Sequence, residues 1–126
     1  MKVLFLPEVR NYFEELSVIL YQKEYFGFFE NALQYADELF SEIEYDLPYK
    51  PKKIAPKYFE RYGEGLFYAT FKRNRNTSWY VFFNIYHTKR ETVFFVRYVS
   101  NNHMIAQFLW VNKRLIYNLF RIICTL

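Results

Sequence analysis

The sequence is poor in the residues that form metal sites and disulfides. It holds one cysteine, Cys124, and two histidines, His87 and His103, among 126 residues. A single cysteine excludes an internal disulfide, and so few soft ligands argue against a structural zinc site. We therefore expect neither a metal nor a cofactor, and a thiol content that is compatible with the cytoplasm.

Long apolar runs are also missing. Residues 3–6 are apolar, but Pro7 stops the run, so the N-terminus does not resemble a signal peptide. The apolar stretch at residues 115–126 is interrupted by Asn118 and Arg121 and is too short to span a bilayer. These features predict a cytoplasmic protein without a membrane partner.

Charge is abundant but unevenly distributed along the chain. Residues 1–48 hold three Lys or Arg against ten carboxylates, a net charge of −7, and residues 49–126 hold fourteen against three, a net charge of +11. Such an asymmetry indicates a polyanionic partner for one surface. The alternative is a fold that is solvated by acids on one face and by bases on the other.

Periodicity predicts a single α+β domain. Residues 3–6 read as an edge strand, and apolar residues recur at helical spacing through residues 8–46, which predicts an acidic two-helix hairpin. Three prolines in residues 48–65 favour an extended loop. Residues 66–72, 79–86 and 92–99 then form an antiparallel meander, and we expect both helices to pack on one face of this sheet.

Strand alternation assigns residues to the two faces of the sheet. Trp79, Val81, Phe83 and Ile85 should face the helices, together with alternate residues of the neighbouring strands. If Phe94, Val96 and Tyr98 face the helices, Phe95 and Arg97 lie on the outward face of the sheet. The outward face then carries tyrosine and phenylalanine rings beside cations, as an RNA-stacking platform does. The alternative is a second core layer that another segment covers.

The C-terminal segment offers such a cover. Apolar residues continue at helical spacing through residues 104–124, so we predict a docked helix there, with residues 110–126 as an extension beyond a domain of residues 1–109. This helix is expected either to pack on the aromatic face or to join two subunits in a homodimer.

The chain resembles the RelE/ParE toxin superfamily, in particular its HigB-like, phage-derived branch. The resemblance rests on KVLF at residues 2–5, PE at 7–8, KYFE at 57–60, LFY at 66–68, WYVFF at 79–83 and RYVSNNH at 97–103, together with the helical hairpin. It implies a type II toxin that binds a cognate antitoxin and, in the RelE and HigB branches, cuts messenger RNA on the ribosome.

The resemblance also implies which residues act. RNA cleavage needs a base for the ribose 2′-hydroxyl, cations for the phosphorane charge and an acid for the leaving oxygen. The family's cation positions are occupied by Lys72, Arg73 and Arg97, and Tyr98 or His103 would serve as acid or base. The branch often has an arginine where this chain has Trp79 and Tyr80. The candidate RNA-binding residues are Lys52, Lys53, Lys57, Arg75, Tyr80, Lys89 and Arg90.

Two other functions are compatible with the same resemblance. One is a non-catalytic protein that keeps the fold and the protein-interaction role without cleavage. The other is a gyrase poison like the ParE branch, which has no enzymatic chemistry either. An endoribonuclease is thus one of three possible functions. In all three we expect an antitoxin protein as a partner. If the protein cleaves RNA, we also expect mRNA and the ribosome as partners.

Overall fold

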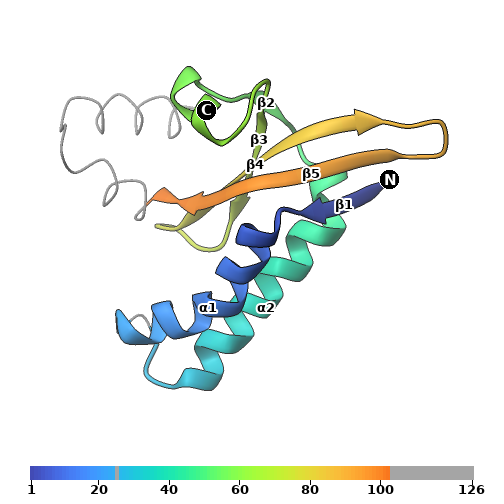
Figure 1. The fold of residues 1–126 in the computed structure, drawn as a ribbon. Coiled ribbons are helices and arrows are strands. Elements are labelled where there is room, and N and C mark those ends of the chain that lie inside the picture. The colour runs from blue at the N-terminus through green and yellow to red at the C-terminus, as the bar shows by residue number, and fades with distance from the viewer. Residues whose placement is uncertain (25, 103–126) are drawn as a thin grey trace.

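The computed structural model describes residues 1–24 and 26–102. The predicted helix at residues 104–124, the extension at 110–126 and the candidate residue His103 lie outside the described residues. Within them the fold is α+β, as the sequence predicted, with two helices on one face of a five-stranded sheet (Figure 1).

The sheet is mixed, with strand order β1-β5-β4-β3-β2. Strand β1 is the edge strand predicted from the sequence and pairs in parallel with β5, while all other neighbours are antiparallel. The long β4–β5 hairpin extends past the ends of the helices (Figure 1). The strands are β1 Lys2–Phe5, β2 Lys53–Ile54, β3 Phe67–Lys72, β4 Ser78–His87 and β5 Thr92–Asn101.

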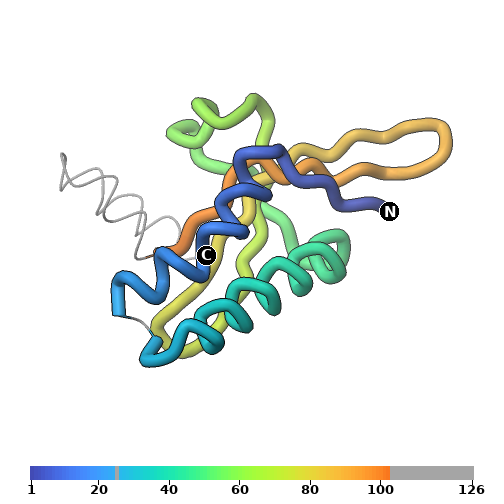
Figure 2. Tube along the Cα trace, turned by 60° about the horizontal axis from the view of Figure 1, so that its bottom comes forward, coloured from blue at the N-terminus to red at the C-terminus, as the bar shows by residue number. Residues whose placement is uncertain are grey.

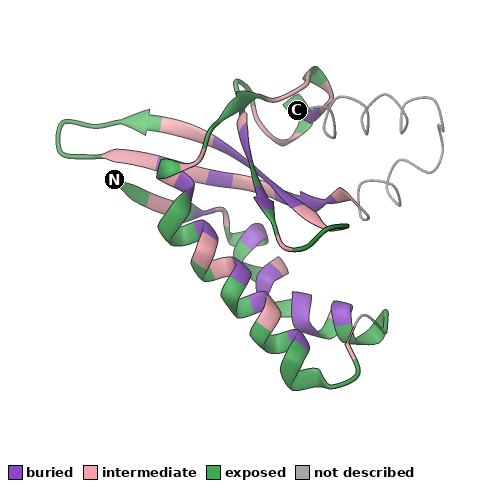
Figure 3. Cartoon of the chain, turned by 180° about the vertical axis from the view of Figure 1, so that it is seen from behind, coloured by how far each residue is buried: buried purple, intermediate pink, exposed green. Residues whose placement is uncertain are grey.

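The two helices are α1, Pro7–Gln22, and α2, Phe29–Asp46. Pro7 suits the first turn of α1 because its missing N–H needs no partner there, and Glu8 lies at the positive end of the helix. Each helix has one buried stripe of apolar residues and one exposed side (Figure 3), and its acidic residues are largely exposed. The prediction that residues 8–46 form two helices on one sheet face is confirmed.

The proline-rich segment differs from the extended loop predicted for it. It contains two short 3₁₀ helices, η1 at Leu47–Tyr49 and η2 at Lys57–Tyr62, with β2 between them. Pro48 lies in the first turn of η1, and Pro56 precedes η2. Proline prevents a continuing α-helix, but its fixed φ suits the start of a single helical turn.

Strand β4 is buried on both of its faces. Trp79, Val81 and Phe83 pack with the helices in one core. Tyr80 and Phe82 belong to a second cluster with Phe59, Leu66 and Tyr68 on the opposite face. Figure 2 shows η2 on the side of the sheet away from the helices. We call residues 55–66 the η2 cover.

The open aromatic platform predicted for this face is therefore wrong for its central part. Tyr80 is 4 % exposed and Phe82 is fully buried. Phe59 stacks on Phe82 with ring centroids 4.2 Å apart. This face instead forms a second core layer, which was the alternative prediction. The η2 cover contributes to this layer because burying its aromatic side chains is more favourable than exposing them to water.

One parity assignment in β5 is also wrong. Phe82 pairs with Tyr98 and Phe83 with Val96, so Arg97 is the extra residue of a β-bulge. Phe94 and Val96 face the helices as predicted, but the bulge shifts Tyr98 to the other face, next to Arg97. A bulge reverses the alternation beyond it, which simple strand parity does not anticipate.

The Phe59→Ala substitution tests the η2 cover. Phe59 is 2 % exposed, so its truncation should lower the free energy of unfolding by about 3–5 kcal/mol, as in other cores. Urea unfolding measures this change. The control Ile54→Ala, at a side chain that is 80 % exposed, should change it by less than about 0.5 kcal/mol. Equal, small effects of both substitutions would contradict the second core.

Candidate functional site

The bulge in β5 places Arg97 and Tyr98 in one pocket. The pocket has a volume of about 360 Å³ and lies where β1 ends and the chain enters α1. It therefore lies between the start of α1 and the end of η2, beside β5. Its lining residues are Leu6, Glu8, Val9, Tyr12, Tyr62, Arg97, Tyr98, Val99 and Ser100.

The Arg97 side chain is held in place by neutral groups. Its Nε donates a hydrogen bond to Asn84 Oδ1, and its Nη2 donates to the Tyr86 hydroxyl at 3.0 Å. The guanidinium also lies 5.0 Å from the ring centroid of Phe95. None of the ion pairs among the described residues involves Arg97. Its positive charge is thus positioned by groups other than the carboxylates of the described residues.

Gly63 makes room for this side chain. A Cβ at Gly63 would lie 2.7 Å from Arg97 Cδ, and the φ of +153° is strained for other residues. Asn84 in turn donates a hydrogen bond to the Glu64 carbonyl at 2.8 Å. Arg97 therefore lies at the junction of β4, β5 and the η2 cover.

Three tyrosines, Tyr12, Tyr62 and Tyr98, are among the residues that line the pocket. The rings of Tyr62 and Tyr98 lie with centroids 3.8 Å apart. Burial, together with Tyr98, raises the pKa of Tyr62 to about 12. Burial also raises the pKa of Tyr12, with Tyr98 and Tyr35 adding to the effect. Near neutral pH Tyr12 and Tyr62 thus remain protonated, so they can donate hydrogen bonds or a proton but are poor bases.

Of the described residues that line this pocket, Glu8 alone is acidic. In the sequence it belongs to the PE pair at residues 7–8, and it was not predicted as a site residue. Tyr12 and Tyr62 were likewise not predicted as site residues. Helical spacing placed Tyr12 on an apolar stripe, and nothing in the sequence signals that residues 8, 12, 62 and 97 meet.

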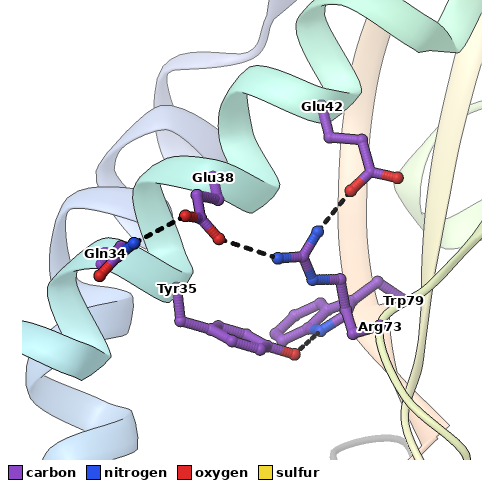
Figure 4. Close-up of polar contacts among 6 residues, drawn as sticks. All are labelled: Gln34, Tyr35, Glu38, Glu42, Arg73 and Trp79. Carbon is purple, nitrogen blue, oxygen red and sulfur yellow. Dashed lines mark hydrogen bonds and ion pairs between the residues drawn. The ribbon is translucent and has the colours of Figure 1, made fainter.

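Arg73 lies apart from Arg97, on the helix side of the sheet. Figure 4 shows its guanidinium between Glu38 and Glu42 of α2. The Glu38 contact is 3.5 Å, and the guanidinium carbon lies 5.1 Å from the ring centroid of Tyr35. The Tyr35 hydroxyl also accepts a hydrogen bond from Trp79 Nε1 at 2.9 Å. These contacts hold α2 against the end of β3 and the start of β4.

Lys72 is exposed at the end of β3 and is distant from Arg97. Lys72 pairs with Ser78, whereas Arg97 lies beside Phe82 and Phe83. Four residues separate these levels of β4, or about 13 Å along the strand. Of the predicted catalytic residues that the structure describes, only Arg97 and Tyr98 come together.

The predicted RNA-binding cations lie at separate places. Lys52, Lys53 and Lys57 are exposed on the segment around β2 and η2, and Arg75 is exposed in the β3–β4 turn. The β4–β5 turn carries exposed Lys89 and Arg90, beside the hairpin end shown as exposed in Figure 3. The ring of Tyr80 is buried beneath other groups and is not placed to stack on a base.

Within residues 1–24 and 26–102, no three His, Cys, Asp or Glu side chains gather as metal ligands. None of the helices in these ranges is long and apolar enough to cross a membrane. Comparison with known proteins finds no match among family models, curated proteins or solved structures.

The raised pKa of Tyr62 predicts a loss of stability at high pH. An unperturbed tyrosine titrates near pH 10, and folded Tyr62 at about 12. Between these values the folded state retains a proton that the unfolded state has lost, so the free energy of unfolding falls as pH rises. Below pH 10 this contribution is fully present.

Urea unfolding across this pH window measures the effect. Tyr62→Phe should make the decline shallower, whereas Tyr45→Phe, at a side chain that is 72 % exposed, should leave it unchanged. The same slope in the wild type and in Tyr62→Phe would show that Tyr62 titrates normally in the folded protein.

Proposed function

We propose that this protein is the toxin component of a type II toxin–antitoxin system and resembles ribosome-dependent mRNA endonucleases. The observation that carries the proposal is the pocket whose lining includes Arg97, Tyr98, Tyr62 and Glu8. Support also comes from the element order, which is the strand, helical hairpin and meander that the resemblance to RelE/ParE toxins implies.

The pocket contains groups for each part of metal-independent RNA cleavage. In the proposed step Glu8 accepts the proton of a ribose 2′-hydroxyl, and the 2′-oxygen forms a bond to the adjacent phosphorus. Arg97 stabilises the added negative charge of the phosphorane. A tyrosine hydroxyl, from Tyr98 or Tyr62, donates a proton to the departing 5′-oxygen as its bond to phosphorus breaks. The products are a 2′,3′-cyclic phosphate and a 5′-hydroxyl.

The proposed partners follow from the charge distribution and the resemblance. The exposed lysines and arginines of the sheet and its loops would contact mRNA and the ribosome, with affinity that falls as salt rises. An antitoxin protein would hold the toxin inactive in the cytoplasm. The proposal also includes one of the two predicted roles of the apolar segment 104–124, which is joining two subunits in a homodimer.

A non-catalytic member of the same fold, or a gyrase poison, is the second candidate. It is favoured by the arrangement of the other predicted cations. Arg73 is paired with Glu38 and Glu42, and Lys72 is about 13 Å from the level of Arg97. Only one of the three expected cations therefore reaches the tyrosine pocket.

Induced expression of Arg97→Ala tests the proposed cleavage. If Arg97 stabilises the phosphorane, its loss should reduce mRNA cleavage by about 100-fold or more and relieve growth arrest. Cleavage is measured by mapping 5′ ends of ribosome-bound mRNA. Because Arg97 also contacts Asn84 and Tyr86, the folded state of the variant is checked by circular dichroism.

Two substitutions with little effect on packing keep the test decisive. Glu8→Gln removes the proposed base at an exposed position and should abolish cleavage, while Glu30→Gln, in the first turn of α2, should not. A wild type that arrests growth without cutting mRNA would favour the gyrase poison. A wild type without any effect on growth would favour the non-catalytic protein.

A further inference from the structure

A second pocket lies on the same sheet face, at the outer edge of β3. Its volume is about 220 Å³, and it is lined by Lys50, Pro51, Lys53, Tyr68 and Thr70. Strand β2 pairs with β3 only at Tyr68 and Phe67, so the edge of β3 beyond Tyr68 is not covered by β2. The pocket lies along this unpaired part of the β3 edge.

The hydroxyl of Tyr68 is buried and has no hydrogen-bond partner among the described residues. The residue as a whole is 2 % exposed, and its ring packs in the second core near Phe82 and Tyr80. Burying a hydroxyl without a partner is unfavourable, and a phenylalanine would fill the same space without that cost. The packing of the second core therefore does not account for the oxygen atom.

The other polar groups of this pocket are cationic or hydroxylic. Lys53 is the register partner of Tyr68, and Thr70 is two residues further along β3, so all three project from the same face. Lys50 lines the pocket from the segment before β2, and its Nζ lies 4.8 Å from the ring centroid of Phe71, which belongs to the helix-side core. Among the described residues, no carboxylate lines the pocket. Burial raises the pKa of Tyr68, so its phenol stays protonated and can donate.

We propose that this pocket binds a phosphate group. Its lining supplies two lysines, a phenol and a threonine hydroxyl as hydrogen-bond donors, its volume leaves room for a tetrahedral oxyanion, and phosphate has acceptor oxygens for all of these donors. The Tyr68 hydroxyl would donate to one oxygen and so gain the partner that the fold does not provide.

The source of the phosphate, unlike the site itself, rests on the proposed function. Tyr68, Phe82 and Tyr98 lie opposite one another on three adjacent strands. The new pocket is thus two strand spacings, about 10 Å, from the Arg97 pocket. If the protein cleaves RNA, the new pocket would hold a backbone phosphate near the one being cleaved. Otherwise the ligand is free phosphate.

Titration of the full chain with inorganic phosphate tests the site, with sodium chloride at matched ionic strength as the reference. Phosphate should raise the melting temperature of the wild type and shift the amide resonances of Tyr68 and Thr70. Tyr68→Phe should weaken phosphate binding by about tenfold. The same variant should melt no lower than the wild type without phosphate, because it removes an unpaired buried hydroxyl.

Matched variants separate this site from general attraction by a basic protein. Lys50→Gln should weaken phosphate binding as Tyr68→Phe does. Lys89→Gln, the same change at the hairpin turn, and Tyr49→Phe, at an exposed tyrosine near the pocket, should leave it unchanged. The proposal is overturned if phosphate acts no differently from chloride, or if Tyr68→Phe binds phosphate as tightly as the wild type does.

A short single-stranded RNA then identifies the source. If the RNA competes with phosphate, and if Tyr68→Phe weakens this competition, the site binds an RNA backbone. If phosphate binds without competition from the RNA, the site binds free phosphate. Both results support the pocket. Phosphate binding in a protein that neither arrests growth nor cuts mRNA would refute the proposed function while leaving the phosphate site intact.

Discussion

Burial of β4 on both of its faces is the constraint on which the rest of the structure depends. Five consecutive residues of this strand, from Trp79 to Phe83, are buried, so each face needs its own covering layer. The helices cover one face, and the η2 cover, with Phe59 stacked on Phe82, packs on the other. Because both faces of the central strand are covered in this way, ligands can bind only near the edges of the sheet. Both candidate pockets lie there, one beside β5 and one beside β3.

The bulge at Arg97 connects this packing to the proposed chemistry. In a regular strand Arg97 and Tyr98 would lie on opposite faces, and only one of them could reach the pocket. The extra residue brings both to the same side, and Asn84, Tyr86 and Gly63 then fix the guanidinium. The same contacts link the η2 cover to the sheet through the Glu64 carbonyl. Bulges commonly redirect a side chain near functional sites, and here the redirection makes a cation and a phenol neighbours.

The sequence predicted the fold more completely than it predicted the site. Helical spacing in residues 8–46 and alternation in β4 are strong local signals, and both were confirmed. The assignments that proved wrong depend on contacts between segments far apart in the chain. Strand parity cannot detect the bulge that shifts Tyr98, and the proline content of residues 48–65 excludes a long helix without indicating that Phe59 would stack on Phe82. The pairing of Arg73 with Glu38 and Glu42 is a further long-range contact, whereas the resemblance to RelE/ParE toxins implied the same role for Arg73 as for Arg97.

The most direct test of where RNA meets this protein is residue-by-residue mapping of chemical shifts while a single-stranded RNA is titrated into the isotopically labelled chain. If the margin beside β5 is the contact site, resonances of Glu8, Tyr62, Arg97, Tyr98 and Ser100 should shift together, and those of Tyr80 and Phe82 should not. Large shifts at Tyr80 and Phe82, with loss of the Phe59 stacking, would mean that RNA displaces the η2 cover and binds the aromatic face. That result, or an absence of shifts at residues 97–100, would contradict the proposed site.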